Sequence, residues 1–140
     1  STSGLAAWIG ALSSNFDTIS IILIVLLSVA IIIILTELTS NTATASTFIP
    51  IFGATALGLG QDPLLLIIPA TLGASCAFMM PVATPPNTIA YASGHINIAD
   101  MVKAGIWLNI TSLIVIGIII ALILGPVFGV ELNKIPIWVN

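Results

Sequence analysis

Two short polar interruptions inside long apolar runs constrain the fold of this chain most. The first, Thr36–Thr42, lies between the apolar runs Ile19–Leu35 and Ala43–Leu59. The second, Ala83–Asn87, reads Ala-Thr-Pro-Pro-Asn and follows the run Leu64–Val82. Apolar runs of this length predict helices, because backbone groups in hydrocarbon must be satisfied within the chain. Polar groups are costly in such surroundings, so we expect the two interruptions to meet in one binding site.

The low charge of the chain indicates its surroundings. Of its 140 residues, 59% are hydrophobic and 5% are charged, whereas a soluble domain has about 25% charged residues. We therefore expect an all-α integral membrane protein that has the lipid bilayer as a partner. With only two Lys and Arg residues, a basic nucleic-acid-binding surface is excluded. The sequence has no H-E-x-x-H or G-x-S-x-G motif, and its one Cys and one His cannot build a metal cluster, so we do not expect an enzyme.

Segment lengths divide the chain into five expected parts. The run Ile19–Leu35 would measure roughly 26 Å as a helix at about 1.5 Å per residue, which is short for a bilayer core of about 30 Å. This favours a re-entrant helical hairpin, although two ordinary crossings fit as well. The expected parts are an interfacial amphipathic helix at residues 1–15, a helical hairpin with a Ser-Asn-Thr tip at 16–60, a broken transmembrane helix at 63–94, a full transmembrane helix at 104–128 and a tail at 129–140.

The proline pair of the second interruption predicts a break in a helix. Pro85 and Pro86 have no backbone N–H. The carbonyls four residues earlier, on Pro81 and Val82, are therefore expected to lose their helical partners. Unpaired carbonyls at a helix C-terminus suit a small hard cation such as Na⁺. Asn87 is expected to open the next half-helix, whose N–H groups would face the same gap.

The first interruption predicts a place for an anion. A helix that begins at Ser40–Thr42 presents free N–H groups with a partial positive charge, which attract carboxylate, phosphate or sulfate. The side chains of Ser40, Asn41 and Thr42 can donate hydrogen bonds to the same anion. Simple helix capping is the alternative, since Ser, Asn and Thr all favour the N-cap. A cation held nearby would lower the cost of holding the anion, which is a physical basis for coupling.

Other polar residues carry weaker signals. Glu37 would repel an anion, so we expect it to turn away from that site or to lie at a membrane interface. Asn109, Thr111 and Ser112 form a polar patch in the last apolar run, and interhelical hydrogen bonding is its simplest interpretation. The segment His95–Lys103 is expected to be a polar connection.

These stretches together resemble a known family. They are Thr36–Ala45 (Thr-Glu-Leu-Thr-Ser-Asn-Thr-Ala-Thr-Ala), Pro69–Thr88 with its Ala-Thr-Pro-Pro-Asn-Thr ending, Ala92–Gly94 (Ala-Ser-Gly) and Asp100–Gly105. In this order and spacing they resemble the divalent anion/Na⁺ symporter family, which carries dicarboxylates, citrate or sulfate. The resemblance implies that the chain is the C-terminal inverted repeat of a longer ion-transporter-type fold.

The resemblance also implies a site and a mechanism. The substrate would be a divalent anion such as succinate, malate, citrate or sulfate. It would move with Na⁺ through an elevator-like motion of a homodimer in the plasma membrane, the inner membrane of a bacterium, with the N-terminal repeat of the same chain as a partner. A proton-coupled or exchanging anion transporter and a non-transporting packing subunit are the alternatives. The implied Na⁺ ligands are Thr36, Asn41, Ala83 and Pro85, and the implied substrate-binding residues are Ser40, Asn41, Thr42 and Thr84.

Overall fold

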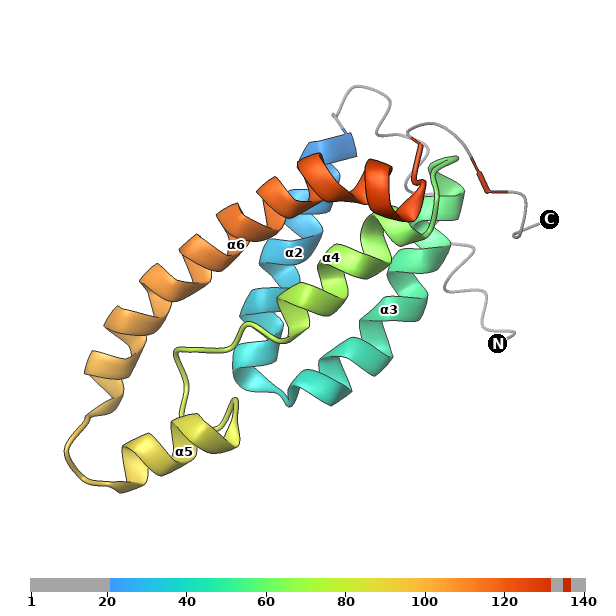
Figure 1. Ribbon diagram of the computed structural model, residues 1–140. Coiled ribbons are helices and arrows are strands. Elements are labelled where there is room, and N and C mark those ends of the chain that lie inside the picture. Colours follow the sequence, from blue (N-terminus) through green and yellow to red (C-terminus); the bar gives the residue numbers. More distant parts are fainter. Residues whose placement is uncertain (1–20, 132–134, 137–140) are drawn as a thin grey trace.

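The computed structural model describes residues 21–131 and 135–136, and in these ranges every regular element is a helix. The interfacial helix expected at residues 1–15 and most of the expected tail lie outside the described residues. The all-helical prediction is confirmed for the described part (Figure 1). The helices are α2 (Ile21–Leu38), α3 (Asn41–Gly58), α4 (Leu64–Ala74), α5 (Pro85–Ala92) and α6 (Ile98–Phe128).

Helix α4 is the centre of the packing. It lies between α2 and α3, and α6 packs against both α4 and α2 (Figure 1). Near one end of the bundle, Val25 of α2, Ala56 of α3 and Leu66 of α4 share an apolar core with residues of α6. Farther along, Ile32 of α2 packs with Ala70 of α4. The small residues of α3 and α4 allow these helices to approach closely.

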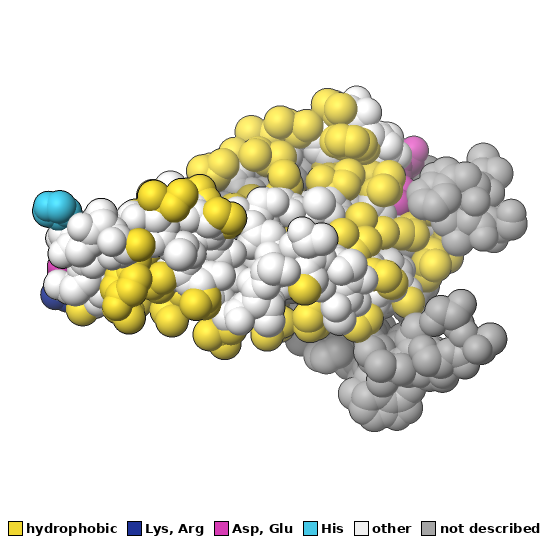
Figure 2. Space-filling view, turned by 90° about the horizontal axis from the view of Figure 1, so that it is seen from below, with side chains coloured by type: hydrophobic (Ala, Val, Ile, Leu, Met, Phe, Trp, Pro, Cys, Tyr) yellow, Lys and Arg dark blue, Asp and Glu magenta, His cyan; other side chains and the backbone are white. Residues whose placement is uncertain are grey.

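Two described helices have the length and apolarity that a membrane crossing requires. These are α2, with 18 residues, and α6, with 31. Much of the surface of α6 is apolar, and Trp107 is 72% exposed. Figure 2 shows hydrophobic side chains spread over the elongated body, with charged side chains gathered at its two ends. An apolar girdle between charged ends fits a bilayer setting.

The break between α4 and α5 differs from the expected one. Helix α4 ends at Ala74 and not at Val82, and residues 75–84 form a non-helical linker. The prolines do not interrupt a helix interior. Pro85 and Pro86 occupy the first turn of α5, where a missing N–H costs nothing. The prediction that the prolines end the preceding helix is therefore wrong.

Helix α6 also begins earlier than expected. Its first residue is Ile98, so two thirds of the segment expected to be a polar connection is helical. Asn97 caps this end, because its side-chain oxygen accepts the N–H of Asp100 at 2.9 Å. Asp100 in the first turn also complements the positive end of the helix dipole. At the other end, Gly129 adopts a φ of 66° and closes the helix after Phe128.

Candidate ion and anion site

The turn between α2 and α3 is short and places a capping residue at the start of α3. Ser40 has an extended conformation, and its side-chain oxygen accepts the N–H of Ala43 at 3.2 Å. The capping alternative is therefore realised for Ser40. Capping leaves the other first-turn amides of α3 directed out of the helix end, where the partial positive charge of the helix lies.

Three oxygen atoms cluster behind this turn. The hydroxyl of buried Thr36 lies 2.7 Å from Oδ1 of Asn41 and 2.9 Å from the carbonyl oxygen of Ala74. A hydroxyl has one hydrogen, so it can donate fully to only one of these two acceptors at a time. A group of oxygen atoms with too few hydrogens between them suits a hard cation. The structure thus brings together Thr36 and Asn41, and it adds the Ala74 carbonyl, which sequence reasoning missed because the helix was expected to continue.

The carbonyls of the linker are held by the first turn of α5. Asn87 donates from Nδ2 to the carbonyls of Ala77 at 3.0 Å and Met80 at 3.1 Å. The hydroxyl of Thr88 donates to the carbonyl of Pro81 at 2.6 Å. Pro81, whose carbonyl was expected to lose a helical partner, lies outside any helix, and its carbonyl accepts this side-chain hydroxyl instead. Asn87 and Thr88 therefore hold the linker, whereas α5 itself begins at Pro85 and not at Asn87 as expected.

A shallow hollow lies where the linker meets the turn. Its volume is about 430 Å³. Thr84, whose side chain accepts the N–H of Asn87 at 3.4 Å, is the N-cap of α5 at this hollow. Thr42 has an exposed side chain on α3 and is not among the lining residues. The hollow is lined by Ser40, Val82, Ala83, Thr84, Pro85, Thr88 and Ile89.

The expected site residues therefore fall into two neighbouring groups. Ser40 shares the hollow with the residues at the end of the linker. Asn41 follows Ser40 in the chain and reaches back to Thr36 in the oxygen cluster. Convergence of the turn and the linker, which the sequence predicted, is thus seen at Ser40.

Glu37 is a buried acidic residue next to Thr36 of the oxygen cluster. Its side chain is only 2% exposed, and it is not among the residues that line the hollow, which agrees with the expectation that it turns away from the anion site. The carboxylate accepts the backbone N–H groups of Phe78, Met79 and Met80 at 2.8–3.1 Å. Nδ2 of Asn109 on α6 donates to the same carboxylate at 2.7 Å, which makes this part of the polar patch an interhelical hydrogen bond as expected.

A polar helix start beside an interrupted apolar helix is the arrangement with which helical secondary transporters build ion and substrate sites. The described fold and site therefore fit that class of membrane protein. Comparison with known proteins gives the family. Residues 1–130 match the model described as "Sodium:sulfate symporter transmembrane region", and the chain belongs to this family of transporters, which are not enzymes. The resemblance stated from the sequence is thereby confirmed.

Individual relatives agree with the family. The chain is 40% identical over 134 residues to the sodium-dependent dicarboxylate transporter SdcS of Staphylococcus saprophyticus. It is 42% identical over 134 residues to the proteins of the same name from Staphylococcus aureus strains MRSA252 and USA300. Each match covers 96% of this chain and 26% of the relative. The chain thus spans about a quarter of the length of the relatives that it matches.

Proposed function

We propose that this chain is part of a Na⁺-coupled secondary transporter of dicarboxylates or related divalent anions. One observation carries the proposal: the turn at Ser40 and the linker end at Thr84 line the same hollow, with the oxygen cluster of Thr36 directly behind the turn. The names of the relatives, which are sodium-dependent dicarboxylate transporters, support the choice of ion and substrate.

In this proposal the cation sits among oxygen atoms. The Thr36 hydroxyl and the Asn41 side chain supply two ligands, and Ala83 and Pro85 supply backbone oxygens. Such neutral oxygen donors suit Na⁺, which keeps its charge available to a neighbouring anion. A cation would also settle the competition for the single Thr36 hydrogen, because Asn41 and Ala74 could then both direct lone pairs at the ion.

The anion sits at the start of α3 in this proposal. Ser40 caps the helix and lines the hollow together with Thr84, and Asn41 and Thr42 follow Ser40 in the first turn. The helix start favours negative charge. An adjacent Na⁺ adds to this attraction, so that each ligand raises the affinity for the other, and the coupling is reciprocal. These groups would recognise the charged oxygen atoms of the anion, which succinate, malate, citrate and sulfate have in common.

The larger assembly is part of the same proposal. The chain would form the C-terminal inverted repeat, with α2 and α3 as a re-entrant hairpin and α4 and α5 as the broken helix. An N-terminal repeat of the same full-length chain would complete the site. The protein would work as a homodimer with elevator-type alternating access in a bacterial inner membrane. The 26% coverage of the relatives leaves room for that second repeat and for a dimerising scaffold.

Uptake of labelled succinate into proteoliposomes tests the proposal in the full-length protein. Uptake should require an inward Na⁺ gradient and should stop when choline replaces Na⁺. Asn41→Ala and Thr84→Ala should each lower uptake about tenfold or more, since a hydrogen bond to a charged group contributes about 1.5–3 kcal/mol. The matched control is Thr71→Ala, because the Thr71 hydroxyl is exposed and bonds only its own helix, at the carbonyl of Ile67.

Two results would contradict the proposal. Uptake that follows a pH gradient or a counter-substrate, and ignores Na⁺, would favour the proton-coupled or exchanging alternative. Unchanged uptake in both Asn41→Ala and Thr84→Ala would remove the site assignment.

A further inference from the structure

The linker that follows α4 is held by a pair of adjacent residues on α2. In a continuing helix, the N–H of Phe78 would donate to the carbonyl of Ala74, four residues earlier. Here the two groups have separate partners. The Ala74 carbonyl accepts the hydroxyl of Thr36 at 2.9 Å, and the Phe78 N–H donates to the carboxylate of Glu37 at 2.8 Å. Thr36 and Glu37 thus replace both halves of one helical hydrogen bond.

The carboxylate of Glu37 extends this replacement over the next two residues. Its two oxygen atoms also accept the N–H groups of Met79 at 3.0–3.1 Å and Met80 at 3.0 Å. In a continuing helix these groups would bond the carbonyls of residues 75 and 76. Three successive N–H groups around one negative charge form an anion-binding concavity. These N–H groups would otherwise be unsatisfied in an apolar body, where each such group costs several kcal/mol.

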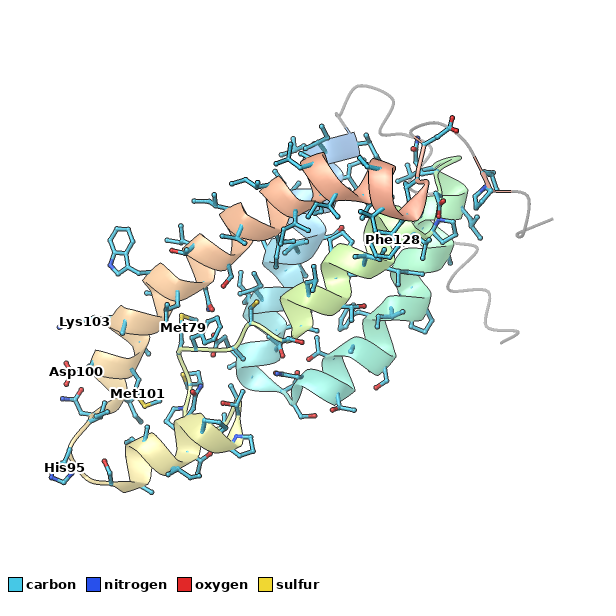
Figure 3. The ribbon with its side chains drawn as sticks, in the orientation of Figure 1. Met79, His95, Asp100, Met101, Lys103 and Phe128 are labelled. Carbon is cyan, nitrogen blue, oxygen red and sulfur yellow. The ribbon has the colours of Figure 1, made fainter. Side chains whose placement is uncertain are left out.

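Helix α6 packs closely against the same linker and also forms a hydrogen bond with Glu37. Asn109 donates to Oε1 of Glu37, and Gly105, one turn earlier, lies where the linker crosses the helix. A Cβ at Gly105 would lie 2.6 Å from both the Cα of Met79 and the carbonyl oxygen of Phe78. The linker therefore passes through a slot that only glycine leaves open. Figure 3 shows Met79 in this linker beside α6.

We propose that Glu37 is a positioning residue that ends α4 at Ala74 and fixes the linker, and thereby the oxygen atoms of the proposed ion site. This deepens the proposed function and rests on it for the part that concerns Na⁺. Glu37 is also next to the proposed ion site in the chain, because Thr36, which directly precedes it, belongs to the oxygen cluster. The fixed linker leads directly to Ala83 and Thr84 at the hollow. Glu37 itself contacts neither ion nor anion in this scheme.

Hydrogen exchange of the full-length protein in detergent tests the hold on the linker without any reference to transport. Glu37→Gln keeps the size of the side chain but replaces one acceptor oxygen by a donor, which faces the N–H groups of the linker. Exchange at Phe78–Met80 should become at least about tenfold faster, the order of effect of a hydrogen bond to a charged group. Asn109→Ala, which removes one donor and leaves the carboxylate, should give a smaller acceleration. Asp100→Asn, the same chemical change on an exposed side chain, should give none.

Succinate uptake with the same variants tests the consequence for the ion. In Glu37→Gln the Na⁺ concentration for half-maximal uptake should rise about tenfold or more, by the same estimate for a lost hydrogen bond to a charge. The KM for succinate at saturating Na⁺ should change much less. A purely structural role would lower the amount of folded protein and leave the Na⁺ response of the remainder unchanged.

The outcomes separate the two proposals. Unchanged exchange at Phe78–Met80 in Glu37→Gln would overturn the role of Glu37 in holding the linker. Faster exchange with an unchanged Na⁺ response would overturn its role in positioning the ion site. Wild-type uptake that does not depend on Na⁺ would refute the proposed function and the ion-positioning role together, while the exchange result would still decide whether Glu37 holds the linker.

Discussion

Substitution of Gly105 by alanine should displace the linker without touching Glu37. The added Cβ would meet the Cα and Cγ of Met79 and the carbonyl oxygen of Phe78, each at 2.6 Å. Ordinary contacts of a Cβ begin at 3.4 Å, so the linker and α6 must separate by about 0.8 Å. Two of the three atoms are backbone atoms, which cannot turn aside as the end of a side chain can. Overpacking of this kind costs about 1–3 kcal/mol.

The separation should also weaken a specific hydrogen bond. Asn109 lies one turn after Gly105 on α6 and bonds the carboxylate of Glu37 at 2.7 Å. Where α6 takes up the movement by shifting about 0.8 Å away from α2, this contact would lengthen to roughly 3.5 Å, beyond the usual range of a hydrogen bond. The carboxylate would then lose one of its donors while staying buried. Overpacking and the loss of this contact should therefore both lower the stability of the protein.

Thermal unfolding and hydrogen exchange of the full-length protein in detergent measure the effect. Gly105→Ala should lower the apparent Tm and speed exchange at Phe78–Met80. The matched control is Gly125→Ala on the same helix, where the added Cβ meets only the carbonyl of Val130 at an ordinary 3.6 Å. That variant should be neutral or stabilising by up to about 1 kcal/mol, because alanine favours a helix more than glycine. If Gly105→Ala behaved like Gly125→Ala in both measurements, the slot described for the linker would not exist.

Two further predictions concern the ends of α5 and α6. Asn87→Ala should leave the carbonyls of Ala77 and Met80 without their donor, a cost of about 1–3 kcal/mol for each buried group that finds no water; a lower apparent Tm checks this, and an unchanged Tm would contradict it. Asn97→Ala should remove the cap of α6, which costs about 0.5–2 kcal/mol; exchange of the first-turn amides should speed up while the middle of α6 stays protected, and equal exchange in both proteins would count against the cap.

Local sequence patterns predicted the class of the fold and the meeting of the two interruptions, because both follow from apolar runs and from polar residues at their ends. The early end of α4 could not be predicted in this way. It depends on hydrogen bonds between Glu37 and residues 41 to 43 positions later in the chain. No propensity within Leu64–Val82 encodes such a contact. The proline pair predicted a break in a helix, but in the structure it forms the beginning of α5.

The start of α6 is a different case, because a local signal was present. Asn97 and Asp100 are spaced as an N-cap residue and the third residue of a helix, which is a recognised starting pattern. The polar character of this segment favoured a connection instead. The pairing of Thr36 with Asn41 was implied by the family resemblance, whereas the position of the Ala74 carbonyl beside them required knowing where α4 ends.

The shortness of α4 has a consequence for hydration. Its 11 residues extend about 16 Å at about 1.5 Å per residue, roughly half the thickness of a bilayer core of about 30 Å. The carbonyl of Ala74 therefore ends up beside Thr36, in a residue that is buried among α2, α3 and α4. An ion that arrived there would have shed most of its water shell on the way. The oxygen atoms gathered at that depth would have to replace the shell, and their number and spacing would then decide which ions can dehydrate and enter.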